Sequence, residues 1–233
     1  MRRMALAFLR PSDAFRGLSA EPWSWAAPAV LVCLLMSLAP QIVYDLHYQR
    51  QQVALDTLVD RGLLGAETAR AARLRIADDA ADRGPGRIAQ QVTVSGVTAL
   101  AFRFILPAAL LLMGLRFALA SRVGFSAVLG ALSLAALPAG LREIVRTPLQ
   151  YAKGSLDVYF GPAALAGHTR TPGAQALGLL DFFDLWVLAL LIVGLAEVGQ
   201  VSRGRAAALV LPLWLALALL RFGLKASPLG AAF

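Results

Sequence analysis

Apolar residues gather along the chain in long blocks, which short arginine-containing segments and one long polar segment separate. A block of about 17–25 apolar residues has the length of an α-helix that crosses a bilayer. The pattern therefore predicts an all-α polytopic membrane bundle of five transmembrane helices, over residues 25–44, 92–120, 125–141, 182–198 and 206–220. The last four spans, within 92–224, would complete one membrane domain.

Residues 45–91 interrupt the apolar pattern with paired charges and good helix formers. A Gly-Pro-Gly turn at 84–86 ends the helical part of this segment. We expect an extramembrane helical hairpin between the first two spans, with its second helix over about 66–81. Leu58 and Leu74 fall on its two apolar stripes, and they are the candidate residues for docking a partner.

Residues 1–24 form an amphipathic lead to the first span. The sequence Pro-Ser-Asp at 11–13 predicts a turn or a helix start. We expect Phe8, Phe15 and Leu18 to lie on the membrane surface, with the neighbouring arginines directed toward lipid headgroups.

The composition agrees with a membrane protein, since 58% of the residues are hydrophobic and 15% are charged. Soluble domains are about 25% charged. The formal net charge of +8 would suggest nucleic-acid binding in a soluble protein. Here the arginines flank the apolar blocks, so orientation in the membrane explains them and we expect no nucleic-acid partner. With one cysteine and two histidines, we also expect no metal site and no cofactor.

The density of basic residues indicates an orientation. Eight arginines lie in the lead and in the short loops at 116–124 and 199–205. An excess of basic residues in short loops marks the cytoplasmic side. We therefore expect a cytoplasmic N-terminus. Five spans then place the hairpin and the C-terminus on the extracytoplasmic side.

Five charged residues lie inside or beside the predicted spans, namely Arg103, Arg116, Asp181, Asp184 and Glu197. Asp181 and Asp184 open the fourth span, where an N-cap aspartate and an acid three residues later suit the positive helix end. We expect Asp181 to cap that helix, and the alternative is that the two aspartates form an ion or proton site. An intramembrane arginine usually finds a partner, so we expect Arg103 to pair with one of the two aspartates. Arg142 and Arg146 are the other available partners.

Glu197 and a group of three charged residues at the end of the third span also carry expectations. Glu197, near the other end of the fourth span, would pair with an arginine of the loop at 203–205 or with Arg116. Arg142, Glu143 and Arg146 would form a solvated end of the third span.

The sequence contains none of the common catalytic motifs. The chain has no G-x-S-x-G, H-E-x-x-H, phosphate-binding loop or G-x-G-x-x-G motif. No pair of carboxylates has a companion base or nucleophile at a recognisable spacing. We therefore do not expect an enzyme.

Two segments carry a resemblance to a known family. The first is FLRPSDAFRGLSAEPWSWAAPAVL, which enters the first span, and the second is DFFDLW at 181–186, followed by Gly-Leu-Ala at 194–196. They resemble the Yip (Ypt/Rab-interacting protein) domain family, in its bacterial branch. The resemblance covers about residues 11–220. It implies five membrane helices, a cytoplasmic N-terminus and no enzymatic activity. Eukaryotic relatives act in vesicle trafficking and bind small GTPases, and accessory roles beside transport machines are suspected for bacterial relatives.

The sequence supports a non-enzymatic scaffold or accessory protein of the bacterial inner membrane. Its partners would be the lipid bilayer and a membrane protein of a transport or export complex. The alternative is a small oligomeric transporter or channel that uses Arg103, Asp184 and Glu197. Five spans without a visible internal repeat would require that transporter to be an oligomer. A third interpretation is a protein that shapes or senses lipid through its amphipathic lead.

Overall fold

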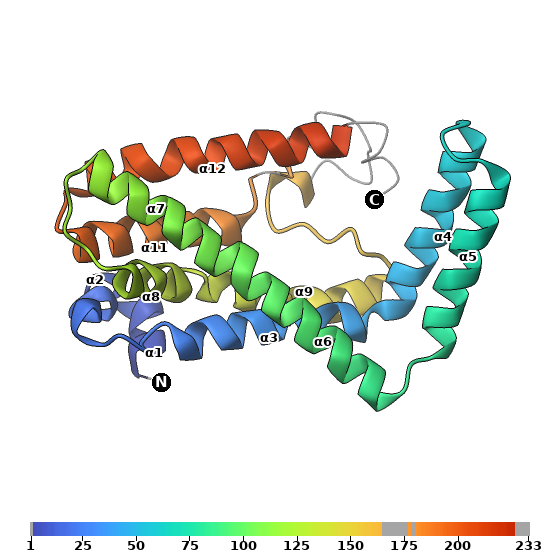
Figure 1. Cartoon of the computed structure of the whole chain (residues 1–233), viewed down its shortest axis with the longest axis horizontal. Coiled ribbons are helices and arrows are strands. Elements are labelled where there is room, and N and C mark those ends of the chain that lie inside the picture. Colours follow the sequence, from blue (N-terminus) through green and yellow to red (C-terminus); the bar gives the residue numbers. More distant parts are fainter. Residues whose placement is uncertain (1, 165–176, 179, 227–233) are drawn as a thin grey trace.

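The computed structural model describes residues 2–164, 177, 178 and 180–226, and every regular element within them is helical (Figure 1). In chain order the elements are α1 (Arg2–Leu9), α2 (Pro11–Phe15), η1 (Leu18–Ala20), α3 (Ala26–Ile42), α4 (Tyr44–Asp60), α5 (Ala66–Ala81), α6 (Pro85–Ala99), η2 (Leu100–Ile105), α7 (Leu106–Phe117), α8 (Phe125–Ala135), α9 (Leu137–Lys153), η3 (Pro162–Ala164), α11 (Phe182–Gly199) and α12 (Arg203–Ala226).

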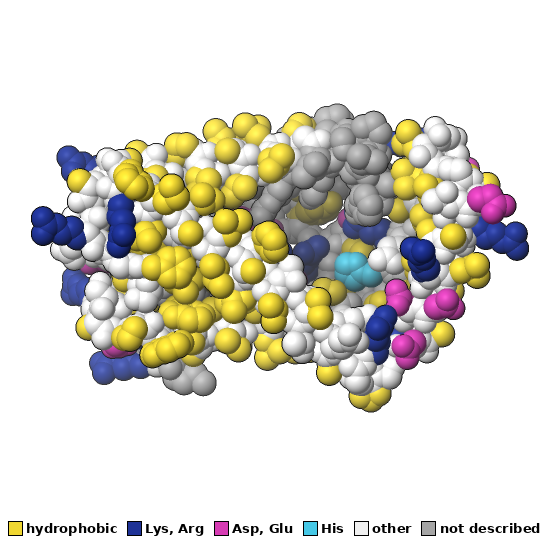
Figure 2. Space-filling view, in the orientation of Figure 1, with side chains coloured by type: hydrophobic (Ala, Val, Ile, Leu, Met, Phe, Trp, Pro, Cys, Tyr) yellow, Lys and Arg dark blue, Asp and Glu magenta, His cyan; other side chains and the backbone are white. Residues whose placement is uncertain are grey.

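Four helical stretches among the described residues are long and apolar enough to cross a membrane, namely Pro85–Phe117, Phe125–Lys153, Phe182–Gly199 and Arg203–Leu220. A fifth is added if α3 and α4 count as one broken span, since they meet at a bend of 69°. The chain is thus a multi-pass, all-helical membrane bundle, as the hydropathy pattern predicts. Hydrophobic side chains cover much of the face of the long helices in Figure 2.

The second span is longer than expected. α6, η2 and α7 form one helix of 33 residues, which begins at Pro85 rather than near residue 92. Proline is favoured at the first position of a helix, because its missing N–H has no intrahelical partner there. The helix crosses the bundle diagonally in Figure 1. Its middle section, η2, is π-helical and contains Arg103.

The third span forms the centre of the bundle. Within α8, every residue from Ala127 to Ala135 is buried. The helical path then continues through α9 to Lys153, well beyond the predicted end at 141. Gly154 ends α9 with a left-handed backbone at φ 62°, a conformation that glycine adopts without strain.

The amphipathic lead packs into the bundle, so the expectation that its apolar residues lie on the membrane surface was wrong for two of them. Phe15 and Leu18 are each only 1% exposed. A glycine makes room for the first of them: a Cβ built on Gly194 would lie 2.9 Å from Phe15 Cε1. Phe8 lies at the rim, with its ring 5.4 Å from that of Trp186.

Arg3 holds the lead in its folded path. Its Nη1 donates to the carbonyl oxygens of Ala14 and Arg16, at 3.0 and 2.8 Å. Its Nη2 lies 2.7 Å from Glu21 Oε1. One guanidinium therefore joins α1 to the segment that leads into α3.

The helices α4 and α5 form the predicted hairpin, called the arm below, which projects from one end of the bundle (Figure 1). The amides of Leu63 and Leu64 close its tip by donating to the carbonyl of Leu58. Arg73 and Asp56 form an ion pair between the two helices. Of the residues of α4 and α5, all of which the structure describes, only Ala69 is buried.

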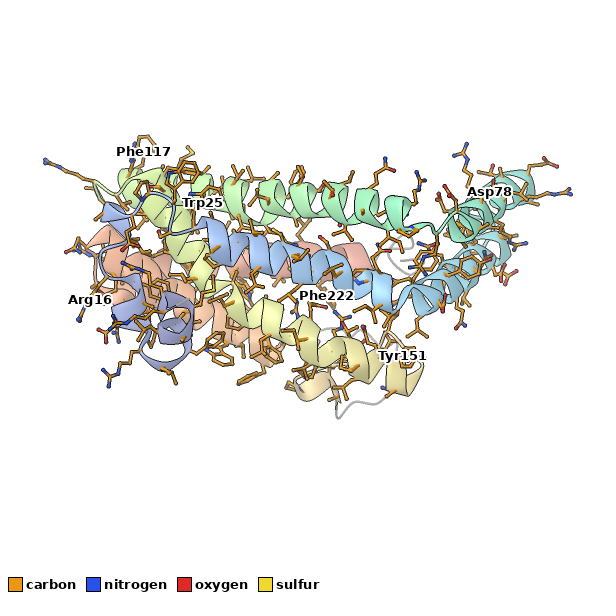
Figure 3. All side chains as sticks on the ribbon, turned by 90° about the horizontal axis from the view of Figure 1, so that it is seen from below. Arg16, Trp25, Asp78, Phe117, Tyr151 and Phe222 are labelled. Carbon is orange, nitrogen blue, oxygen red and sulfur yellow. The ribbon has the colours of Figure 1, made fainter. Side chains whose placement is uncertain are left out.

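The two ends of the molecule differ in charge. Arg16, Trp25 and Phe117 lie at one end and Asp78 of the arm at the other (Figure 3). The lead and the loops after α7 and α11 share the first end, where basic side chains predominate (Figure 2). The arm carries acidic and basic side chains together (Figure 2).

Candidate functional site

The start of α11 is fixed by its own capping residue. Asp181 is the N-cap, and its Oδ1 accepts from the amides of Phe183 and Asp184, at 2.8 and 3.4 Å. These bonds satisfy two amides that lack an intrahelical partner, and such a cap stabilises a helix by about 1 kcal/mol. The predicted capping role of Asp181 is thereby confirmed.

Asp184 joins α11 to α9. Its Oδ1 lies 2.9 Å from Arg142 Nη1. Glu143 completes the arrangement, since its Oε1 lies 3.3 Å from Arg142 Nε and 3.9 Å from Arg146 Nη1. These four residues form an ion-pair cluster between the third and fourth spans.

The expectation of a solvated helix end at these positions was wrong. The side chains of Arg142 and Glu143 are only 16% and 12% exposed. The reason is that α9 continues past residue 141, so this turn faces α11 rather than water. The expected pairing of Asp184 with Arg103 was wrong as well. Its partner is Arg142, which was one of the two alternatives.

A cavity of about 220 Å³ lies beside the ion-pair cluster. Side chains from four segments line it, including Arg142, Arg146, Asp181, Asp184, Tyr159 and Trp214. Burial and the negative charge of Asp157 raise the pKa of Tyr159 above the ordinary value of a phenol. The arginines face carboxylates, and Asp181 is occupied by the helix N-terminus. This arrangement therefore favours a structural role, in which the cluster holds α9 against α11, over a role in acid–base catalysis.

Arg103 belongs to a different part of the molecule. It lines a groove of about 590 Å³ between α3 and α6. Its Nη1 lies 3.4 Å from Met36 Sδ. The π-helical turn places this arginine beside α3, whereas both aspartates lie at the start of α11.

The two charged residues near the opposite end of the bundle are also separate. Arg116 Nε and Nη2 donate to the carbonyl of Val123, at 3.3 and 3.2 Å, and so close the loop between α7 and α8. Among the described residues, no ion pair involves Glu197, so its expected pairs are not formed. Arg203 instead donates to Ser12 Oγ at 3.2 Å and joins the loop after α11 to the lead.

The structure thus brings Asp181 and Asp184 together but separates them from Arg103, Arg116 and Glu197. Sequence reasoning missed Tyr159 and Trp214 as cavity residues. Tyr159 lies in the loop that follows α9 and Trp214 lies on α12, and no periodicity links either of them to the aspartates.

The long apolar helices and the ion-pair cluster between them define a polytopic helical membrane protein. A comparison with protein families then identifies the chain more closely: the family model for the Yip1 domain matches residues 5–224. The chain therefore belongs to the Yip1 domain family. Comparisons with curated proteins and with solved structures found no match.

Proposed function

We propose that this protein is a non-enzymatic membrane scaffold that assists a transport or export assembly. The bundle anchors it, and the arm docks a helical segment of a partner membrane protein. Membership of the Yip1 domain family supports the membrane role. The observation that carries the docking role is the lack of a core in the arm.

The arm has more helix than its own packing can support. Its helices contain 17 and 16 residues and bury only Ala69 between them. Most helical stability in proteins comes from packing of an apolar face. Val53, Leu63 and Leu74 are nevertheless 54%, 51% and 61% exposed. A partner surface over these residues would supply the missing packing.

The charge of the arm favours a protein partner over a lipid surface. Residues 44–84 contain six arginines and seven acidic residues, whereas the whole chain carries a net charge of +8. A segment with no positive excess gains little from anionic headgroups. Interspersed charges of both signs suit packing against another helix.

The two docking candidates differ in what they can test. Leu58 is half-buried, and its carbonyl accepts the hydrogen bonds that close the tip. A polar substitution there would disturb the arm itself. Leu74 is 61% exposed, so its substitution changes the surface that a partner would meet.

The charged end of the bundle supports the orientation. Arg10, Arg16 and Arg122 are exposed at the end formed by the lead and by the loops after α7 and α11. By the positive-inside rule this end lies in the cytoplasm. The arm then lies on the extracytoplasmic side of a bacterial inner membrane, within reach of the extramembrane parts of a partner.

The separation of the charged residues weakens the transporter alternative. Arg103 lines the groove on α6, Asp184 lines the smaller cavity, and Glu197 lies near the end of α11. A permeation path would bring such residues onto one continuous wall. Asp184 is also paired with Arg142 at 2.9 Å.

Site-specific photocrosslinking in native membranes tests the docking role. A photoreactive amino acid at Leu74 should give one adduct of defined mass, and the same probe at Thr68 on another side of α5 should give much less. Leu74→Asp should lower the amount of that partner recovered about tenfold, since loss of an apolar anchor is of that order. Thr68→Asp is the matched control. Equal recovery with both variants would contradict the proposal.

A further inference from the structure

Positive charge is concentrated at the end of the molecule opposite the arm (Figure 2). The lead at 1–24 and the loops at 116–124 and 199–205 form that end, which is called the basic end below. They contain eight arginines and two acidic residues. Residues 44–84, which include the arm, contain six arginines and seven acidic residues. The two ends of the molecule therefore differ in net charge as well as in packing.

The two acidic residues of the basic end are already paired within the lead. Asp13 Oδ1 lies 3.0 Å from Arg16 Nη1, and Glu21 Oε1 lies 2.7 Å from Arg3 Nη2. Glu197, in the last turn of α11, adds one negative charge nearby. The other arginines of this end outnumber it and form no ion pair among the described residues. They are Arg2, Arg10, Arg116, Arg122, Arg203 and Arg205.

Hydrogen bonds join the three segments of the basic end into one surface. Ser121 Oγ, in the loop after α7, donates to the carbonyl of Gly199 at the end of α11, at 2.8 Å. Arg203, at the start of α12, donates to Ser12 Oγ of the lead at 3.2 Å. The positive charges are therefore presented by a connected surface rather than by three independent loops.

Each of the three segments contributes an exposed arginine to this surface, namely Arg10, Arg122 and Arg205. Among the described residues, their side chains take part in no hydrogen bond or ion pair. An exposed guanidinium without a partner in its own chain can donate to an external anion at no cost in broken contacts. These three arginines are the strongest candidates for holding one.

The surroundings of these arginines favour a lipid as the source of that anion. Arg122 lies three residues before α8, and Arg205 lies in the first turn of α12, so both are close to the ends of spans. Large apolar side chains of the same end are exposed, since Leu9, Trp23 and Phe117 are 79%, 75% and 83% exposed. The boundary between headgroups and acyl chains accepts charged and apolar side chains together.

We propose that the basic end binds the headgroups of anionic phospholipids and keeps a shell of these lipids around this end of the bundle. Arg10, Arg122 and Arg205 supply the counter-charges for the headgroup phosphates, and the exposed apolar side chains lie among the adjoining acyl chains. The surface lies opposite the arm, so the proposal goes beyond the docking role and does not depend on it.

The test measures which lipids bind to the purified full-length chain in a neutral detergent, by native mass spectrometry. Short-chain phosphatidylglycerol and phosphatidylcholine with the same chains compete at equal concentration. We expect the bound lipid to be enriched in phosphatidylglycerol about tenfold or more, because one basic residue near an anionic surface changes binding about fivefold. Higher salt should reduce the enrichment, since it screens exposed charges.

Two variants of the same three arginines separate charge from folding. The triple variant Arg10→Gln, Arg122→Gln, Arg205→Gln should lower the enrichment about tenfold. The triple variant Arg10→Lys, Arg122→Lys, Arg205→Lys keeps the charges and should retain most of the enrichment. Both should melt at the temperature of the unmodified chain, because exposed substitutions have small effects on stability.

The matched control removes three arginines from the arm. Arg61, Arg70 and Arg75 are also exposed, and their side chains form no hydrogen bond or ion pair among the described residues. The triple variant Arg61→Gln, Arg70→Gln, Arg75→Gln lowers the net charge of the chain by the same amount. It should keep the enrichment within about twofold, because the arm has no positive excess to attract the lipid.

Two results would overturn the proposal. One is equal binding of the two lipids by the unmodified chain, and the other is an enrichment that persists in the triple glutamine variant of the basic end. Purification from native membranes examines the other possible occupant, an acidic protein. If such a protein is lost in that variant while the unmodified chain shows no preference for phosphatidylglycerol, the basic end binds a protein and the lipid proposal is wrong.

Discussion

The bundle and the arm are both helical, but they are stabilised in different ways. In α8 every residue from Ala127 to Ala135 is buried, whereas the two helices of the arm bury only Ala69. Small residues let helices approach closely in a membrane, and α8 contains several of them. The arm has ion pairs and an exposed apolar stripe instead. The bundle therefore holds itself together, whereas under the proposed function the arm gains its packing from a partner.

The largest expected effect falls on the contact between the lead and the bundle. Gly194→Leu would place a side chain where Phe15 packs, since a Cβ there already meets Phe15 Cε1 at 2.9 Å. Overpacking of this kind costs about 1–3 kcal/mol or more. We expect a lower melting temperature and faster tryptic cleavage within the lead. A Cβ on Gly204 would meet nothing within 4 Å, so Gly204→Leu should leave the melting temperature and the rate of cleavage unchanged. Equal behaviour of the two variants would show that this contact does not hold the lead.

The next effect concerns the ion-pair cluster. Asp184→Asn would leave Arg142 without its partner across the helices, in a position only 16% exposed. An exposed ion pair contributes about 0–1 kcal/mol, and loss of one partner of a buried pair costs about 3–5 kcal/mol. We therefore expect the free energy of unfolding to fall by an amount between these limits. A double-mutant cycle with Arg142→Gln measures the coupling directly. Additive single effects would mean that the pair does not fasten α9 to α11.

A smaller effect is expected at the helix cap. Asp181→Ala should destabilise the bundle by about 1 kcal/mol, while Asp181→Asn should retain most of the stability, because asparagine also caps well. Denaturation in mild detergent measures both. A loss in Asp181→Asn as large as that in Asp181→Ala would indicate a role for the negative charge beyond capping.

The smallest effect on the isolated protein should come from the arm. Leu74→Asp changes a side chain that is 61% exposed, so the free energy of unfolding of the purified protein should change by only about 0.5 kcal/mol or less. A large loss would mean that the arm is part of the folding unit rather than an addition to it.

The sequence predicted the helical class, the apolar segments long enough to cross a membrane, the second arm helix at Ala66–Ala81 and the cap at Asp181. All of these depend on local signals such as block length, turn residues and capping chemistry. The burial of Phe15 depends on Gly194, far away in sequence, and the partner of Asp184 depends on how α9 faces α11. Hydropathy also marks the part of a helix that fits the membrane, so it placed the start of the second span near residue 92 rather than at Pro85.

The most direct test of the difference between bundle and arm is amide hydrogen exchange, measured on the purified protein in lipid nanodiscs and again on the protein in native membranes. In nanodiscs the amides of α4 and α5 should exchange far faster than those of α8, because local opening costs least where few apolar contacts are made. In native membranes the arm should become protected while α8 stays unchanged. Arm amides as protected as those of α8 in the purified protein would contradict the account.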